Sequence, residues 1–506
     1  MATKTATRSK SAKVTKGAKK ALEVADVPKT KKAKNSDKAT LVADNAHSEA
    51  VALTKSLLEN MLDESITDVK KKMGLAGTAF DPDEPRLHTG LVSLDLLIGG
   101  GIVSGGWYTI FGGEQSAKTT IAMTIMSAII KQGFEGKASY WDYEGSGSPD
   151  YIESILKSQG VKQTLSQIFG ERDPDTGEEI TPPIVDYIST DGGEEFFEFY
   201  NRLKRILPDK VKLGKEYYYL FPHDKKLLKR FKSVYDPKYL SKHNKIKVPA
   251  ADGMMQAIAL LDSYPAMLPR QEDTDEGSNA MALQARMFSK ELKRIKGSMK
   301  KKRMTVFGVN QLRQKPATMF GNPEYEPGGE ALKFFSDCRI KSTSRALPSG
   351  WGKGPTMDEK SVEHEGNDEY RFINLKVIKN KLGGLQYQDT FARIWIRDAD
   401  GVARGLDPVF DTWNFLKMLG VVGGTRGNMK FHEDCPLHGA KKCSWLSFKA
   451  LVLGNKRQVK ETCDLLGVKP VDIRFWCKKQ LANGKALKNF ALICAGKGDL
   501  VADEED

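Results

Sequence analysis

The pattern of hydrophobic and polar positions divides most of the chain into short apolar runs that alternate with helical patterns. The apolar runs predict strands, and they are WYTIF (107–111), ASYWDY (138–143), AIALLD (257–262), MTVFGVN (304–310) and FINLKVIKN (372–380). Strands that alternate with helices are typical of a parallel sheet covered by helices. We therefore expect an α/β fold built on a mostly parallel sheet flanked by helices.

The same pattern indicates how the chain is divided. Stretches rich in Gly, Asp, Glu and Pro (169–184) or in Lys and Tyr (about 207–250) interrupt the core, and we interpret both as insertions. The expected divisions are a basic disordered tail (1–42), an N-terminal helical oligomerisation segment (43–85), a core (86–408), a small C-terminal α/β domain (409–492) and an acidic tail (493–506).

Charge points to a polyanionic partner. The formal net charge is +14, and residues 1–38 alone hold 12 Lys and Arg against 3 Asp and Glu. A segment of this composition cannot bury enough apolar surface to fold. Three interpretations remain for it: a solvated arm, an arm that holds duplex DNA without reading its sequence, or a targeting signal.

Cysteine usage and hydropathy suggest the compartment. Six scattered cysteines without a secretory leader pattern favour a reducing environment, so we expect a cytoplasmic protein. No apolar stretch reaches the roughly 20 residues of a membrane-spanning helix, and no membrane partner is expected. One short stretch holds His432, Cys435, His438 and Cys443. Their spacing fits no common zinc pattern, so buried thiols are the alternative to a structural zinc.

GGEQSAKTT (112–120) follows a predicted strand and opens a predicted helix, which is the context of a P-loop. Backbone N–H groups of such a loop converge on phosphates at the helix N-terminus. Lys118 would place a cation beside the β- and γ-phosphates, and the Thr119 hydroxyl would bind Mg²⁺. The candidate ATP-binding residues are Gly112, Gly113, Glu114, Gln115, Ser116, Ala117, Lys118, Thr119 and Thr120.

Three positions around this loop refine the prediction. Ala117 stands where the P-loop pattern has its second glycine, and a methyl group is tolerable there only if φ is below zero. Asp262 ends an apolar strand, where a carboxylate can reach Mg²⁺ through water. Glu144 follows another strand and could deprotonate the attacking water. The alternatives are a capping Asp262 and a surface Glu144.

Most of residues 88–408 resemble the bacterial RecA family. The resemblance rests on HTGLVSLDLLIGGGIVSGGWYTIFGGEQSAKTT, on YWDYEGSGSPDY and, most specifically, on VFGVNQLRQKPATMFGNPEYEPGGEALKFFSDCRI (306–340). It implies a RecA-like P-loop ATPase core in which Glu144 is the base and Tyr151 stacks on adenine. Ser148 stands where the family usually has an acidic residue.

The match over 306–340 implies the second DNA-binding loop of the family. Gln311 then corresponds to the residue that senses the γ-phosphate and signals to the loop, with a buried Gln capping a strand as the alternative. In this loop, cations would hold the DNA backbone, apolar side chains would enter between bases, and glycines would let the main chain approach phosphates. The candidates are Arg313, Lys315, Met319, Phe320, Gly328 and Gly329.

A first DNA loop would be PRQEDTDEGSNA (269–280), followed by a basic helix. Arg286, Ser289 and Lys293 recur on one face of that helix, and the resemblance places this face against DNA. A plain basic surface is the alternative.

KVIKNKLGG (376–384) resembles the family's segment that reaches into the ATP site of the neighbouring subunit. Lys379 and Lys381 are two apart on a predicted strand, so both side chains should leave one face and flank a triphosphate. The resemblance also makes Lys333 and Phe334 interface residues, although Phe334 could equally belong to the core. ATP between subunits implies a helical filament.

Together these features predict an ATP-dependent recombinase that forms filaments on single-stranded DNA and pairs it with homologous double-stranded DNA. A hexameric replicative helicase is one alternative, but it does not explain the match over 306–340. A non-catalytic DNA-coating protein is another, with Ala117 as the mark of a decayed ATP site. The unmatched tail, insertion and C-terminal residues favour a divergent, phage-encoded member that acts in the host cytoplasm.

Overall fold

The computed structural model describes residues 84–145, 147–173, 175–270, 280–314, 324–344, 362–365, 368–397, 405–425 and 427–496. The basic tail, nearly all of the N-terminal helical segment and the last residues of the acidic tail lie outside the described residues. So do Lys315, Met319, Phe320 and residues 271–279 of the first predicted DNA loop.

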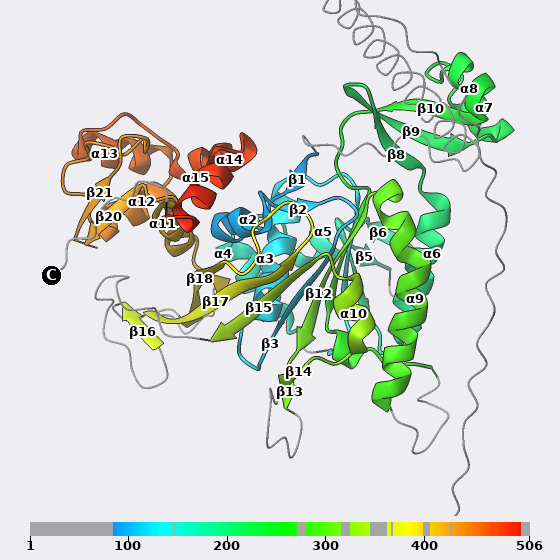
Figure 1. Cartoon of the computed structure of the whole chain (residues 1–506), viewed down its shortest axis with the longest axis horizontal. Helices are drawn as coiled ribbons and strands as arrows, with labels where there is room; N and C mark the ends of the chain where they lie inside the picture. Colours follow the sequence, from blue (N-terminus) through cyan, green and yellow to red (C-terminus); the bar gives the residue numbers. More distant parts are fainter. Residues whose placement is uncertain are drawn as a thin grey trace, which may run out of the picture. The chain divides into compact units, whose positions relative to one another are not determined.

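A mixed sheet forms the centre of the described part of the chain (Figure 1). Its strands are β3 (Trp107–Gly112), β4 (Lys137–Asp142), β7 (Val185–Ser189), β11 (Ala257–Asp262), β12 (Met304–Gln311), β15 (Cys338–Ser344), β16 (Val362–Glu365), β17 (Asp368–Asn380), β18 (Asp389–Arg397) and β19 (Gly405–Leu406). The order is β19-β18-β17-β15-β3-β12-β11-β4-β7, with β16 beside β17. All five predicted strands are therefore confirmed.

The strands from β7 to β15 run parallel to their neighbours, whereas β15, β17, β18 and β19 pair antiparallel. Alternate side chains of a strand point to opposite faces. In β11, Ile258 and Leu260 join one hydrophobic core while Ala259 and Leu261 join the other. The expected α/β fold, a mostly parallel sheet buried on both faces, is confirmed.

Helices cover the two faces. The helices of this core are α2 (Val92–Ile98), α3 (Lys118–Lys131), α4 (Pro149–Ser158), α5 (Leu165–Phe169), α6 (Gly193–Ile206), α9 (Ala280–Lys302) and α10 (Gly329–Phe335). Ile121 and Ile125 of α3 lie in the first core, and Phe196 of α6 and Phe288 of α9 lie in the second. None of the described helices has the length and apolar character needed to cross a membrane.

Smaller elements complete the core and occupy the interrupting stretches. Before β3, β1 (Arg86–Leu87) pairs with β2 (Ile102–Val103), and in the first interrupting stretch β5 (Glu171–Arg172) pairs with β6 (Glu179–Thr181). The Lys/Tyr-rich stretch forms a three-stranded antiparallel sheet with two short helices. Its elements are β8 (Asp209–Leu213), β9 (Glu216–Pro222), α7 (Lys225–Arg230), α8 (Pro237–His243) and β10 (Lys245–Ala250).

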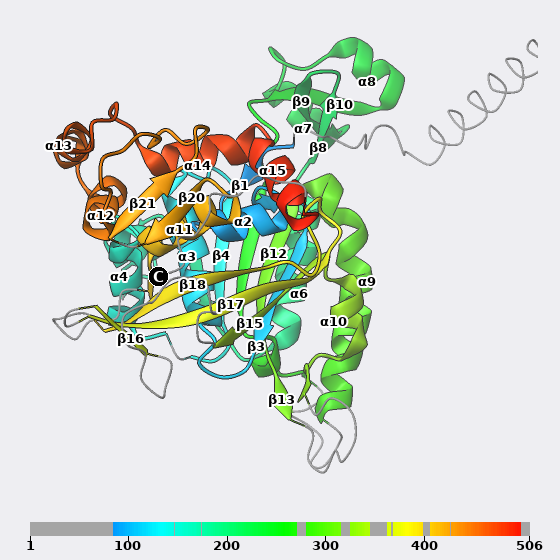
Figure 2. The same cartoon turned by 60° about the vertical axis from the view of Figure 1, so that its left-hand side comes forward.

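The C-terminal residues are mostly helical. Their elements are α11 (Pro408–Met418), β20 (Val422–Thr425), β21 (Asn428–Phe431), α12 (Trp445–Leu453), α13 (Lys456–Leu466), α14 (Ile473–Ala482) and α15 (Lys485–Cys494). In Figure 2, α2, α11 and α14 lie side by side, in agreement with their mutual contacts. The Asp411 carboxylate of α11 accepts hydrogen bonds from the backbone N–H groups of Val92, at 2.7 Å, and Ser93, at 3.2 Å.

Candidate nucleotide-binding site

The loop between β3 and α3 has the form that a phosphate group requires. A Cβ on Gly112 would lie 2.1 Å from the Ser342 carbonyl oxygen, so only glycine fits beside β15. A Cβ on Gly113 would meet no atom within 4 Å, so the main chain is open there. Helix α3 begins at Lys118 without a side-chain cap. Its first N–H groups therefore suit phosphate oxygens.

Ala117 corrects one expectation. Its φ is 59°, in the left-handed region, and not below zero as the sequence suggested. The loop must turn in this sense to enter α3, and alanine accepts the conformation at a cost of about 1–2 kcal/mol. Gln115 also has a positive φ, of 55°. Two non-glycine residues of the loop therefore adopt the left-handed conformation.

Lys118 is the cation of this site. Its side chain is nearly buried, and its ammonium donates hydrogen bonds to the Gly113 carbonyl at 2.6 Å and to the Ser116 hydroxyl at 3.3 Å. Burial lowers its pKa, while the nearby carboxylates of Asp262 and Glu144 oppose that shift. A cation held against the loop in this way can exchange a carbonyl for a phosphate oxygen.

Asp262 provides an oxygen suited to Mg²⁺. Its side chain is only 4% exposed, and burial raises its pKa to about 6, against the opposing effects of Thr119 and Tyr140. The Tyr140 hydroxyl donates to Oδ2 at 3.1 Å, whereas Oδ1 makes no hydrogen bond of normal geometry within the described residues. Mg²⁺ prefers carboxylate, hydroxyl and water oxygens. Asp262 and Thr119 therefore fit the expected cation.

Glu144 and Gln311 meet across the carboxyl edge of the sheet. The Gln311 side-chain amide at the end of β12 donates to Glu144 Oε1 at 2.7 Å, and the Ser263 hydroxyl donates to the same oxygen. Strand β11 separates β4 from β12, so this contact spans two strand spacings. The buried-cap interpretation of Gln311 is wrong, because its side chain is only half-buried and its amide bonds the exposed Glu144 carboxylate rather than its own strand.

Asp142, which the sequence analysis missed, positions Glu144. Its Oδ1 accepts the backbone N–H groups of Glu144, at 3.1 Å, and Gly145, at 2.8 Å, while its Oδ2 accepts the Tyr187 hydroxyl at 2.6 Å. The signal was present, because an Asp two residues before another polar residue at a strand end is typical of an Asx-turn. The turn fixes the direction in which Glu144 leaves β4.

Gln311 also stands at the entrance to the predicted second DNA loop. The adjacent Asn310 donates its side-chain amide to the Pro327 carbonyl at 3.1 Å, where the chain returns. Short strands β13 (Arg313–Gln314) and β14 (Glu324–Tyr325) pair at the base of the loop. Entrance and exit are thus tied together next to Glu144. Arg313 is exposed.

Gly328 and Gly329 end this loop and begin α10, both with positive φ. A Cβ on Gly329 would lie 2.8 Å from the Ala285 side chain of α9. These glycines are therefore required by close packing and backbone conformation, whatever else approaches them.

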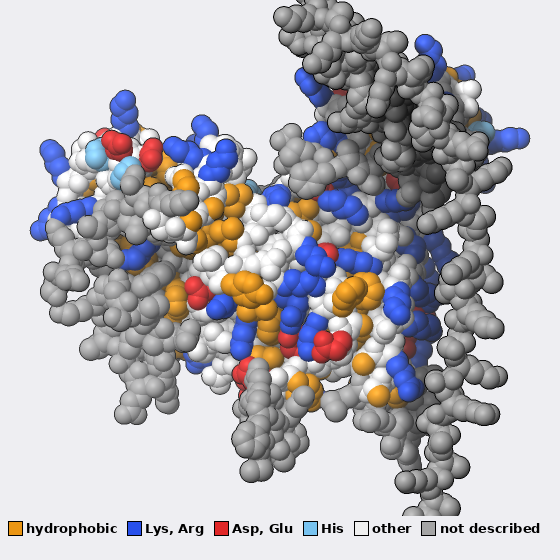
Figure 3. Space-filling model, viewed as in Figure 1, with side chains coloured by type: hydrophobic (Ala, Val, Ile, Leu, Met, Phe, Trp, Pro, Cys, Tyr) orange, Lys and Arg blue, Asp and Glu red, His pale blue; other side chains and the backbone are white. Residues whose placement is uncertain are grey.

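Helix α9 carries the other predicted DNA contacts. Arg286 and Lys293 are exposed, and Ser289 between them is half-buried. In Figure 3, Lys and Arg side chains gather along the part of the surface where α9 lies. The structure thus brings the three residues onto one basic face, as their spacing predicted.

Lys379 and Lys381 only partly follow the expected strand geometry. Strand β17 ends at Asn380, so Lys381 lies beyond the strand. Even so, both lysines reach α10: Lys379 donates to the Phe334 carbonyl at 2.9 Å, and the Lys381 ammonium lies 5.8 Å from the centre of the Phe334 ring. Phe334 is 68% exposed, so its assignment to the core is wrong. Lys333 beside it pairs with Glu330.

Tyr151 lies on α4, close to the start of α3. Its hydroxyl is hydrogen bonded to the Thr120 hydroxyl at 2.9 Å, and its side chain is half-buried. Ser148 is the N-cap residue of the same helix. It is exposed, and its side chain makes no capping hydrogen bond. The ring is therefore held next to the P-loop, where the resemblance expects adenine.

The candidate zinc ligands do not gather. Within the described residues, no group of three or more His, Cys, Asp and Glu side chains is arranged to hold a metal ion. Cys435 and Cys443 are buried, and burial raises the pKa of each thiol to about 12. His438 is bonded to the Phe431 carbonyl through Nδ1. The buried-thiol interpretation of these cysteines agrees with their surroundings.

The fold and this site define a P-loop nucleotide-binding protein of the α/β class. The family model described as the RecA N-terminal domain matches residues 248–390, and the Rad51 model matches residues 85–169. Protein RecA of Thermus aquaticus is 26% identical over 368 residues, covering 71% of this chain and 81% of the relative. Protein RecA of Francisella tularensis subsp. novicida is 26% identical over 345 residues, covering 67% and 72%. The chain is thus similar to RecA proteins, at low identity, over most of its length.

Proposed function

We propose that this chain is an ATP-dependent recombinase that forms filaments on single-stranded DNA and promotes homologous pairing and strand exchange with double-stranded DNA. Similarity to the RecA and Rad51 families supports a recombinase function. The observation that carries the finer proposal is the 2.7 Å hydrogen bond between Gln311 and Glu144. It joins a carboxylate at the nucleotide site to the entrance of a candidate DNA loop.

The residues of the loop and sheet edge have distinct tasks in ATP hydrolysis. Lys118 and the N-terminus of α3 would bind the phosphates, and Thr119 and Asp262 would hold Mg²⁺. The bound cation would neutralise the negative charge that develops on the phosphates. Glu144 takes a proton from the attacking water, and Asp142 keeps its carboxylate in place.

Gln311 couples the nucleotide to the DNA loop. Its amide can bond either Glu144 or a phosphate oxygen, because it has both donor and acceptor atoms. A change of partner moves the end of β12, and Asn310 transmits that movement to Pro327 at the other end of the loop. Arg313, Lys315, Met319 and Phe320 would then hold a DNA strand without reading its sequence.

A filament completes the ATP site from a second copy of the chain. Lys379 and Lys381 extend beside the exposed Phe334, so a neighbour that covers this ring also receives two cations. Cations supplied in trans stabilise the transition state of phosphoryl transfer. Burial of one exposed aromatic ring contributes roughly 2 kcal/mol to the contact.

The chemical part of the proposal is tested by ATP hydrolysis with and without single-stranded DNA. We expect stimulation by DNA, and loss of about 100-fold or more in Glu144→Gln with nucleotide binding retained. The matched control is Glu135→Gln, an exposed glutamate just before the opposite end of β4, which should keep full activity. ATP hydrolysis that single-stranded DNA does not stimulate contradicts the proposal, as does equal activity in the two variants.

The assembly is tested by electron microscopy with single-stranded DNA and a non-hydrolysable ATP analogue. We expect helical filaments that Phe334→Asp prevents. Closed rings would favour the helicase, and DNA coating without any hydrolysis would favour the non-catalytic protein.

A further inference from the structure

The insertion formed by β8–β10, α7 and α8 is strongly basic. Residues 209–250 hold 12 Lys and Arg against 4 Asp and Glu. The matched family ranges end at residue 169 and resume at residue 248, so neither explains nearly all of this segment. Its charge therefore calls for a reason particular to this chain.

The insertion is fixed to the amino edge of the main sheet. It leaves the chain after α6 and returns shortly before β11 begins at Ala257. The Gln256 amide donates to the Pro208 carbonyl at 2.9 Å, and Arg303, just before β12, donates to the Lys210 carbonyl at 3.2 Å. Because β4, β11 and β12 are parallel, this edge is opposite the one that carries Glu144 and Gln311.

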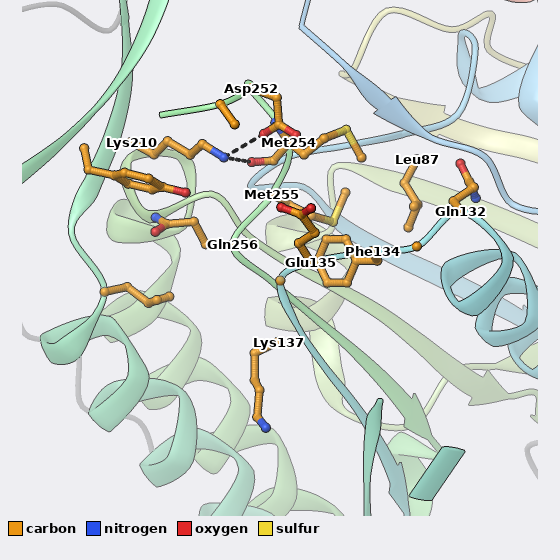
Figure 4. Close-up of a pocket in the computed structure, with 15 residues that line it drawn as sticks. Leu87, Gln132, Phe134, Glu135, Lys137, Lys210, Asp252, Met254, Met255 and Gln256 are labelled. Atoms are coloured by element: carbon orange, nitrogen blue, oxygen red, sulfur yellow. Dashed lines mark hydrogen bonds and ion pairs between the residues drawn. The ribbon is translucent and has the colours of Figure 1, made fainter. Parts of the chain in front are cut away.

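Lys210 anchors the insertion from within. Figure 4 shows its ammonium bonded to the Asp252 carboxylate, at 2.9 Å, and to the Met254 carbonyl, at 3.0 Å, above a cavity lined also by Phe134 and Gln256. The cavity measures about 540 Å³ and lies at the base of the insertion, away from the P-loop. These contacts hold the three-stranded sheet of β8–β10 in a defined position at its base.

The acidic side chains of the insertion are used internally. Asp209 pairs with Lys245 and Lys302, and Asp236 pairs with Lys247. The remaining two do not neutralise the helices either: Asp224 caps the N-terminus of α7, and Glu216 accepts the Tyr218 hydroxyl.

A group of exposed cations is left on and beside the two helices. In the part of the chain that the structure describes, none of them has a carboxylate within ion-pair distance. They are Lys225, Lys226, Lys229, Arg230, Lys232, Lys238 and Lys242. We call them the α7–α8 cations. So many like charges on a short surface repel one another unless a polyanion neutralises them.

The aromatic rings of the insertion do not offer stacking surfaces for bases. They are half-buried, and cations already lie over several of them. The Lys247 ammonium is 4.7 Å from the centre of the Tyr218 ring, and Lys210 is 5.2 Å from that of Tyr219. Phe221 packs on Phe231 at 5.1 Å. What the surface presents is charge, which suits phosphates and not unpaired bases.

We propose that the α7–α8 cations bind the phosphate backbone of duplex DNA, at the edge of the core opposite the ATP site. Duplex DNA carries one charge per about 1.7 Å of its axis, so it satisfies a dense cation group better than a single strand does. The proposal builds on the recombinase function, since strand exchange needs a duplex held apart from the strand bound at the carboxyl edge.

The test compares two variants of the full chain. One replaces Lys225, Lys226, Lys229 and Arg230 with Gln, and the matched control replaces the three lysines with Arg, which keeps the charge. Binding of a short duplex is measured by fluorescence anisotropy over a series of salt concentrations. The Gln variant should bind about tenfold or more weakly, and its salt dependence should fall by up to about 3.6 in log–log slope. The Arg variant should match the unmodified protein.

Single-stranded DNA provides the second readout. Its binding, and the ATP hydrolysis that it stimulates, should be the same in all three proteins. Unchanged duplex binding in the Gln variant overturns the proposal, as does an equal loss for single strands or an equal defect in the Arg variant. Absence of stimulated hydrolysis in the unmodified protein would instead contradict the proposed function, and the duplex measurement would still be informative.

Discussion

Asp262 at the sheet edge and Asp411 at the junction of α11 with α2 are both buried, and burial raises the pKa of each to about 6. Their oxygens are used differently. Asp411 accepts the N–H groups of Val92 and Ser93 and the Ser93 hydroxyl, so both of its oxygens are bonded. Asp262 leaves Oδ1 without a hydrogen bond within the described residues. One aspartate completes a helix N-terminus, and the other keeps an oxygen for a ligand.

The pKa values of the two carboxylates agree, so the hydrogen bonding of their oxygens is what distinguishes the structural carboxylate from the functional one. An unsatisfied buried oxygen is costly, and at Asp262 a cation bound beside the nucleotide loop would offset that cost. The nucleotide loop has further features of this kind, since Gln115 and Ala117 both have positive φ. At the start of α2, by contrast, the Asp411 carboxylate caps the N–H groups with both of its oxygens.

The largest effect should come from Asp262→Asn. We expect ATP hydrolysis to fall about 100-fold because an amide holds Mg²⁺ less well than a carboxylate. The free energy of unfolding should stay the same or rise, since a buried charge is removed. Steady-state hydrolysis and urea unfolding measure the two quantities. A loss of stability as large as that of an Asp411 variant would remove the contrast.

Asp411→Ala should give the opposite result. It leaves the backbone N–H groups of Val92 and Ser93 without an acceptor, so the free energy of unfolding should fall by about 2–3 kcal/mol. Hydrolysis per folded molecule should be unchanged. Chemical denaturation followed by circular dichroism measures the loss, and a decrease in activity at full folding would contradict a purely structural role.

The titration of both Asp262 and Asp411 should contribute to the pH dependence of the free energy of unfolding. Their pKa values are raised in the folded state, so the native protein binds more protons than the unfolded chain between about pH 4 and 6. Stability should therefore decrease as pH rises through this window, by at most about 1.4 kcal/mol per pH unit for each group. Thermal unfolding from pH 4 to 7 tests the sign, and each Asp→Asn variant should weaken the dependence.

Adding Mg²⁺ and ATP should distinguish Asp262 from Asp411 in the same thermal-unfolding measurement. Only Asp262 must be ionised to hold the cation, so the stabilisation by Mg²⁺ and ATP should shrink as pH falls below about 6. Asp411→Asn should leave this effect in place. Stabilisation that is independent of pH would show that Asp262 does not serve the cation.

The sheet was predictable from the sequence because its strands are buried on both faces and appear as continuous apolar runs. AIALLD is an example, with Ile258 facing one core and Ala259 the other. The position of Asp262 followed from the same run. Parallel strands bring their carboxyl ends to one edge, so Glu144 and Gln311 could be expected near each other.

Other features depended on contacts that no local pattern encodes. Asp142 holds Glu144 through an Asx-turn that many surface aspartates also form. Asp411 meets Val92 only because residues 319 positions apart pack together. The left-handed conformation of Ala117 was mispredicted because the loop imposes it from both ends, against the preference of the residue. These features are determined by tertiary packing and not by the conformational propensities of the residues.

The smallest effect concerns the backbone strain that distinguishes the nucleotide loop from the α11–α2 junction. Ala117→Gly removes a cost of about 1–2 kcal/mol in the folded state, and the added freedom of the unfolded chain cancels about 0.4–1 kcal/mol of that. The free energy of unfolding should therefore rise by roughly 0.5–1 kcal/mol. Ala122→Gly, inside helix α3, is the control and should lower the free energy of unfolding by about 1 kcal/mol or more.

Nucleotide binding should be the same in Ala117→Gly and the unmodified protein, since both follow one backbone path. A variant that gains ATP affinity by tenfold would mean that the alanine marks a decayed site, and one that loses stability like Ala122→Gly would mean that the loop is unstrained.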